Sequence, residues 1–191
     1  MRVFWLLILL VSIGTSSAGD QMWLLDAAAS SMNFESSKNT TIRETHSFSE
    51  LSGHVSSDGD IVIQVDLMSV DTGIPIRDER MRNLLFKIGP AARVSAEVDM
   101  QAVAMLAEAE GVTLDLEATL SLNGKESPLP MRLDLTRLSD SQIQVVSEGL
   151  IDVAEYGYST GIEALREIAG LQHISTDVPY QLTLRFEKTN P

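Results

Sequence analysis

Strict alternation of apolar and polar residues is the feature of this sequence that most constrains its fold. Between residues 112 and 122 every second residue is apolar, and the residues between them are Thr, Asp, Glu, Thr and Ser. Because successive side chains of a strand point to opposite faces, this pattern predicts a β-strand with one buried face. Asn123-Gly124 follows directly and is the strongest short signal for a tight hairpin turn. Residues 129–136 repeat the alternation, so the chain should contain a long antiparallel hairpin.

The same two-residue period recurs from end to end of the chain. It is clear at residues 61–69 and 178–186, and further strand candidates are shorter or less regular: 30–35, 40–48, 51–57, 93–100 and 142–153. Long strands with one apolar face must form a sandwich or a closed barrel, because open edges promote aggregation. We predict a single all-β domain, an antiparallel barrel of about eight strands, wide enough to be filled by side chains or to hold one slender ligand.

Two segments interrupt the strands with the composition of short helices. Residues 77–87 place acidic side chains in a first turn, where the helix dipole favours them, and Gly89-Pro90 ends the segment. Residues 160–169 combine an apolar stripe with a capping box formed by Thr160 and Glu163. Gly170 is a natural stop after this second helix. Residues 101–109 fit either a short helix or a loop.

The N-terminus is predicted to be an export signal. Arg2 precedes the apolar run 3–13, and Ser16-Ser17-Ala18 offers small residues at the positions that signal peptidase reads. The run is too short for a membrane span, which needs roughly 20 apolar residues. We therefore expect residues 1–18 to be a signal peptide cleaved after Ala18, residues 19–191 to form the single domain, and the mature protein, without a transmembrane segment, to be periplasmic.

Charge and composition exclude several functions. The chain carries 27 acidic and 14 basic side chains, for a formal net charge of −13, so it should be repelled by phosphate backbones and bind no nucleic acid. Cysteine is absent, which excludes disulfides, thiolate metal sites and cysteine nucleophiles.

Residues that could carry chemistry are scarce. His46, His54 and His173 lack metal-binding spacing, and the chain has neither a G-x-S-x-G elbow nor a glycine-rich phosphate loop. The carboxylates fall mostly on the outward faces of strands. We therefore predict no catalytic residue, no metal and no cofactor. His46 lies two residues before Phe48 and should therefore face the interior with it. If the protein is an enzyme, His46 is the histidine to examine as a catalytic residue.

Several motifs resemble the YceI-like family of exported proteins. Residues 23–26 (WLLD) followed by 31–34 (SMNF) are similar to the opening W-x-L-D…S-x-x-x-F pattern of that family. Residues 44–53, ETHSFSELSG, are similar to its H/G-x-F…F-x-G segment.

The most specific part of the resemblance lies in the middle of the chain. Residues 69–73 (SVDTG), with 77–82 (RDERMR) and Phe86, are similar to the S-x-D-T…R-D…L-R…F-F block of the family. Asn123-Gly124 coincides with the central hairpin, and residues 178–180 lead into the last strand in the same way. The resemblance implies a lipocalin-like, elongated barrel that binds a polyisoprenoid or another long-chain amphiphile, with a link to isoprenoid quinones.

On this basis we predict a periplasmic binding or carrier protein, not an enzyme. Its partner would be a polyisoprenoid, including quinone-like ones, or another long-chain amphiphilic lipid. Thr72 and Arg77 are the candidates for the mouth of the pocket, where polar groups would select the head of the ligand. The inward-facing candidates for the apolar wall are Phe34, Phe48, Ile63, Val65, Leu67, Leu116, Leu120, Leu133, Leu135, Leu182 and Leu184.

Two alternatives remain open from the residues alone. A lipid-modifying barrel enzyme would need titrating groups inside the barrel. An inert, stress-protective structural protein would have a solid core instead of a cavity. The sequence carries no signal for an oligomeric state.

Overall fold

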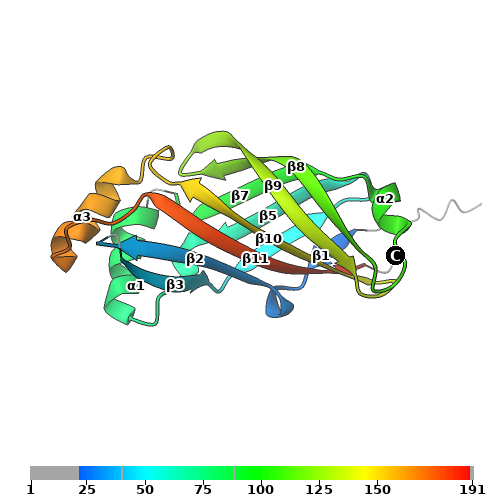
Figure 1. Cartoon of the computed structure of the whole chain (residues 1–191), viewed down its shortest axis with the longest axis horizontal. Helices are drawn as coiled ribbons and strands as arrows, with labels where there is room; N and C mark the ends of the chain where they lie inside the picture. The colour runs from blue at the N-terminus through cyan, green and yellow to red at the C-terminus, as the bar shows by residue number, and fades with distance from the viewer. Residues whose placement is uncertain (1–21, 40, 88, 190–191) are drawn as a thin grey trace, which may run out of the picture.

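The computed structural model describes residues 22–39, 41–87 and 89–189, and these form a closed, elongated antiparallel β-barrel (Figure 1). The ring of hydrogen-bonded strands runs β1-β4-β5-β7-β8-β9-β10-β11 and closes by pairing of β11 with β1, which confirms the predicted eight-stranded, lipocalin-like barrel. The strands of the described residues are β1 (Trp23–Leu25), β2 (Ser31–Lys38), β3 (Ile42–Phe48), β4 (Leu51–Val55), β5 (Asp60–Asp66), β6 (Val70–Asp71), β7 (Ala91–Glu97), β8 (Gly111–Leu122), β9 (Lys125–Arg137), β10 (Gln142–Asp152) and β11 (Asp177–Lys188). The predicted signal peptide lies outside the described residues.

The long hairpin forms as the alternation predicts. β8 and β9 pair without interruption from Gly111↔Thr136 to Leu122↔Lys125. Asn123 has φ +52° and Gly124 has φ +73°, and two successive positive φ angles fit the tight turn whose twist matches a hairpin.

Strands β2, β3 and β6 extend the ring, and β2 does so as the continuation of β1 after a break. β11 pairs with β2 through residues 180–183 and with β1 through residues 186–188, so β1 and β2 are two halves of one interrupted strand. The 3-10 turn η1 (Ala27–Ala29) separates the two halves. Asp26 caps this turn, because its Oδ1 accepts hydrogen bonds from the amides of Ala28 and Ala29 at 3.0 and 3.2 Å.

Strand β5 ends earlier than predicted. The expected strand over residues 61–69 stops at Asp66, and a 3-10 turn, η2 (Leu67–Ser69), follows. The reason is local, because Asp66 Oδ1 accepts a hydrogen bond from the amide of Met68 at 2.8 Å and so caps the turn. Leu67 nevertheless remains buried against the interior.

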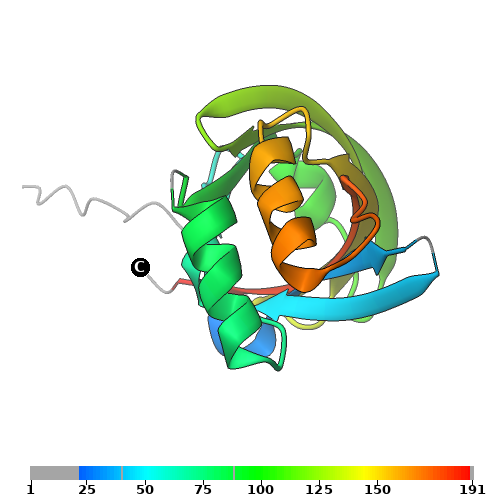
Figure 2. The ribbon, with the colours of Figure 1, turned by 90° about the vertical axis from the view of Figure 1, so that its left-hand side faces the viewer.

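Short helices cover both ends of the barrel. At one end, α1 (Pro75–Met81) continues into the π-helical turn η3 (Arg82–Phe86) and lies beside α3 (Ser159–Ala169) (Figure 2). At the opposite end lies α2 (Met100–Ala104), which begins at the last residue of the strand candidate 93–100 and continues into residues 101–109, whose sequence fitted either a helix or a loop (Figure 1).

The predicted capping box of α3 is wrong. The helix begins at Ser159, and the preceding residue, Tyr158, makes no side-chain capping bond. Glu163 instead accepts hydrogen bonds from the guanidinium of Arg166 one turn later, at 2.6 and 2.8 Å. The predicted stop is confirmed, because Gly170 follows the helix with φ +63°.

The barrel wall divides between β9 and β10 at the end that α1 and α3 cover. These two long strands pair only through residues 133–137 of β9 and 143–147 of β10. Pro128 and Pro130 lie in the half of β9 that β10 leaves unpaired, and a proline has no N–H to offer a neighbouring strand. The wall is therefore less completely hydrogen-bonded at this end, which we call the helix end.

No helix among the described residues is long and apolar enough to cross a membrane.

Candidate ligand-binding cavity

The interior of the barrel holds an open cavity of about 240 Å³. Its walls are apolar and come from strands all around the ring, with Leu85, Phe86 and Ile162 contributed from the helix end. All eleven predicted wall residues line it. Ten lie on strands, where period-two alternation sends their side chains to the inside, and Leu67 reaches the cavity from the turn η2. A solid core would leave no such space, so the geometry suits a slender apolar guest. Contact of these residues with a ligand stays a prediction.

Aromatic rings form a continuous arc at the helix end of the cavity. Phe34 and Phe48 stack with ring centroids 4.9 Å apart, and Phe48 meets Phe86 edge to face at 5.8 Å. Phe86 in turn meets Tyr158 at 6.1 Å, while His46 contacts the other end of the arc at Phe34, at 5.2 Å. We call these five residues the aromatic arc. It offers flat, polarisable faces at the helix end, in contrast to the mainly aliphatic wall elsewhere.

Tyr158 is the polar member of the arc that lines the cavity. Its hydroxyl is buried and has no hydrogen-bond partner among the described residues. Burial raises the pKa of Tyr158 to about 12, so the phenol stays protonated at neutral pH and can donate a hydrogen bond. Buried hydroxyls in proteins are normally satisfied, so an acceptor on a bound ligand is a natural partner for this group.

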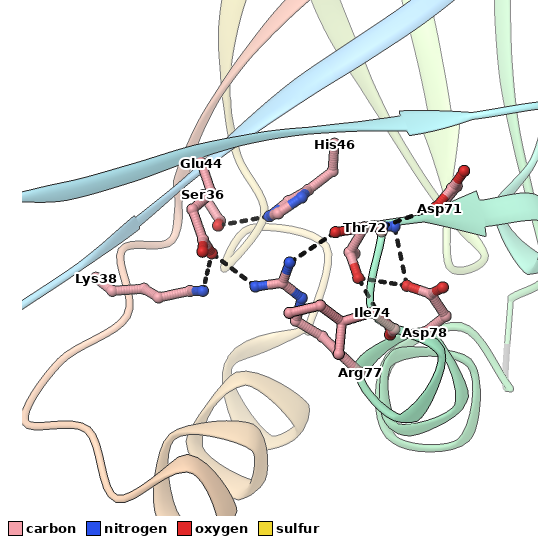
Figure 3. Close-up of polar contacts among 10 residues, drawn as sticks. Ser36, Lys38, Glu44, His46, Asp71, Thr72, Ile74, Arg77 and Asp78 are labelled. Atoms are coloured by element: carbon pink, nitrogen blue, oxygen red, sulfur yellow. Dashed lines mark hydrogen bonds and ion pairs between the residues drawn. The ribbon is translucent and has the colours of Figure 1, made fainter.

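A cluster of polar side chains lies between β2, β3 and the start of α1 (Figure 3). Glu44 binds the ammonium of Lys38 and also accepts a hydrogen bond from Arg77 Nη1 at 2.6 Å. Arg77 Nη2 donates to the carbonyl of Thr72 at 2.8 Å. Asp78 accepts from both the amide and the hydroxyl of Thr72. The Lys38 hydrogen bond, with help from the charge of Arg77, lowers the pKa of Glu44, so the cluster holds a carboxylate.

The structure brings the two predicted mouth residues, Thr72 and Arg77, together at the helix end. Neither is part of the cavity wall, and their polar groups bind Asp78 and Glu44. In this position they fasten α1 to strand β3, and so fix the helix that covers the barrel. Direct contact of either residue with a ligand stays a prediction.

His46 faces the inside of the barrel, as its parity predicted, and is 4% exposed. Its Nε2 lies 2.9 Å from the hydroxyl of Ser36, and its Nδ1 has no hydrogen-bond partner among the described residues. In a Ser–His catalytic pair, a third group normally orients the imidazole through its second nitrogen. Among the described residues, no third group forms a hydrogen bond with Nδ1 of His46.

Acidification should destabilise the protein through His46. Burial, followed by the charge of Arg77, holds the pKa of His46 below its usual 6.5. The unfolded chain therefore takes up this proton at a higher pH than the folded protein, and the unfolded state binds more protons between the two pKa values. Between about pH 7 and about pH 5 the free energy of unfolding should fall further in the parent than in His46→Gln. Denaturant unfolding of both ligand-free proteins at the two pH values measures this, and equal pH slopes would contradict it.

Residues that commonly bind metals do not gather in the described part of the chain. No group of three or more His, Cys, Asp or Glu side chains there is placed to hold a metal ion.

Comparison with known proteins gives a consistent family assignment. The family model of the YceI-like domain matches residues 23–186. No curated protein sequence matches the chain. A solved structure described as a polyisoprenoid binding domain from Saccharophagus degradans, implicated in plant cell wall breakdown, is 43% identical. The match covers 87% of this chain and 98% of that one, with a TM-score of 0.85.

More distant structures share the fold. BcnA of Burkholderia cenocepacia is 16% identical over 84% of this chain and 98% of its own, with a TM-score of 0.66. The YCEI protein of Campylobacter jejuni is 12% identical over 76% and 84%, with a TM-score of 0.52.

Proposed function

This chain belongs to the YceI-like family, and on that premise we propose that it is a periplasmic carrier that holds a polyisoprenoid, including quinone-like ones, or a similar long-chain amphiphile inside its barrel. The observation that carries the proposal is the open cavity with an apolar wall inside the barrel. The 43% identical structure described as a polyisoprenoid binding domain supports the class of ligand.

Binding would be driven by burial of the chain. Each ~100 Å² of apolar surface removed from water contributes about 2.5 kcal/mol before the costs of association. Aliphatic walls distinguish little between hydrocarbons of similar length, so the apolar tail would provide most of the affinity and little chemical selectivity. Selection would depend on the few polar groups that can reach the head of the ligand.

We place the head of the ligand at the helix end. The aromatic arc supplies flat faces there, and the unpartnered hydroxyl of Tyr158 supplies a hydrogen-bond donor at the cavity wall. The same end has the incomplete pairing of β9 with β10 and the short covering helices, which can move more readily than a continuous sheet. The tail would therefore enter first at this end and lie along the barrel.

The ligand can be identified directly. The protein, purified without detergent, is extracted with organic solvent, and the extract is analysed by mass spectrometry beside an extract from a mock purification. We expect a prenyl lipid that is absent from the mock sample. Recovery of no lipid, together with failure to take up added prenols, would contradict the proposal. Turnover of the lipid that Ser36→Ala abolishes would support a lipid-modifying enzyme instead.

Export is a separate expectation, carried by the first eighteen residues. The apolar run and Ser16-Ser17-Ala18 predict cleavage after Ala18. N-terminal sequencing of the protein released by osmotic shock should therefore begin at Gly19. Full-length protein retained in the membrane fraction would contradict both the cleavage and the periplasmic location.

A further inference from the structure

A second cavity lies at the end of the barrel opposite the aromatic arc. Its volume is about 230 Å³, and it lies between α2, the start of β1 and the end of β11. Four residues line both this cavity and the main one, so they form the partition between the two: Trp23, Met100, Val103 and Ile143. We call the second cavity the α2 groove. Resting on the proposed function, we propose that it binds the terminal units of long isoprenoid chains, which reach it by displacing the Met100 side chain in the partition.

The first argument concerns the volume available to the ligand. Pockets for small molecules usually have volumes of about 300–1,000 Å³. The main cavity, at about 240 Å³, lies below that range, whereas the two cavities together fall within it. A chain that enters at the helix end and is longer than the main cavity meets the partition next.

The second argument concerns the partition itself. Trp23, Val103 and Ile143 are buried, but Met100 is partly exposed at the first position of a helix of only five residues. Methionine is unbranched and adapts its shape easily, so it is the member of the partition that can move at least cost. The helix also begins directly after a loop, where Asp99 caps it through the amides of Gln101 and Ala102.

The third argument is that the α2 groove suits a tail better than an anionic head. The guanidinium of Arg137 at its rim already donates to the carbonyls of Ala104 and Leu106 and binds Asp140. The positive charge of Arg137 is therefore already paired within the protein. The ammonium of Lys188 lies over the face of Trp23, with Nζ 5.9 Å from the ring centre, so this second cation is engaged with the indole of the partition.

The test compares a short and a long prenol on the same protein. Delipidated protein is incubated with an equimolar mixture of farnesol and solanesol, freed of unbound lipid, extracted and analysed by mass spectrometry. Met100→Trp should block the partition, and Val103→Ala should widen it. Met105→Trp is the matched control, because Met105 follows α2, is 85% exposed and lines neither cavity.

We expect Met100→Trp to lower the retained ratio of solanesol to farnesol about tenfold, which corresponds to about 1.4 kcal/mol. Val103→Ala should raise the ratio, and Met105→Trp should leave it at the parent value. A parent protein that retains only farnesol would overturn the inference, as would a ratio that neither partition variant changes. A parent that retains neither prenol would instead contradict the proposed function.

Discussion

Leu120→Trp is expected to abolish most uptake of prenyl lipid while leaving the folded protein nearly as stable as before. Leu120 lies on β8, is 3% exposed and faces the cavity, so the larger side chain has free space to occupy. If the indole displaces about 100 Å² of buried ligand surface, the loss is about 2.5 kcal/mol, or between ten- and a hundredfold in Kd. In a solid core the same change would cost about 1–3 kcal/mol of stability.

Two measurements on one variant therefore separate a cavity from a packed core. Denaturant unfolding must use delipidated protein, because bound ligand raises apparent stability by mass action. Glu117→Trp is the control, since Glu117 lies on the exposed face of the same strand and should change neither quantity. A large loss of stability in Leu120→Trp, with normal lipid uptake in the variant that still folds, would contradict the assigned cavity.

The strand residues of the cavity wall were predictable because two simple rules determine which side chains face the interior. Period-two alternation decides which side chains point inward, and the Asn123-Gly124 turn fixes the register of β8 against β9. Leu116, Leu120, Leu133 and Leu135 therefore reach the interior from sequence pattern alone.

The ends of the elements were less predictable, because single side-chain bonds decide them. Asp66 ends β5 by capping the turn that follows, although the apolar alternation continues through Leu67. Glu163 could have completed a capping box, but a nearby guanidinium, that of Arg166, offered a charged partner one turn away. Such competition between local bonds leaves little trace in hydrophobic periodicity.

The members of the arc and of the partition that lie outside the strands were missed for a different reason. Phe86 and Tyr158 come from segments without alternation, and they reach the cavity only because η3 and α3 lie against the barrel end. Val103 belongs to the segment 101–109, whose pattern fitted both a helix and a loop, and Met100, predicted to end a strand over 93–100, instead begins α2. A resemblance to a family indicates that a ligand is bound, but tertiary packing decides which residues outside the strands touch it.

Gly161→Ala is expected to loosen the packing of α3 against η3 at the helix end. Helix propensity alone would predict the opposite, a gain of about 1 kcal/mol in the free energy of unfolding. A Cβ at position 161 would overlap the carbonyl oxygen of Leu84 and lie 2.6 Å from Leu85 Cδ2, both in η3. Because the first of these atoms is backbone, it cannot move away cheaply, and α3 must shift away from η3. We expect faster release of bound prenol and faster hydrogen exchange in residues 159–169, with an overpacking cost of about 1–3 kcal/mol.

The control for this change is Thr160→Ala, one residue earlier on α3. Thr160 is exposed, so an alanine at this position should raise the helix propensity of α3 without clashing with a neighbour. Release rates that match the parent in Thr160→Ala and rise in Gly161→Ala would show that the contact of α3 with η3 retains the ligand. If Gly161→Ala instead slowed both release and exchange, the two helices would have room between them, and departure of the ligand would have to occur elsewhere on the barrel.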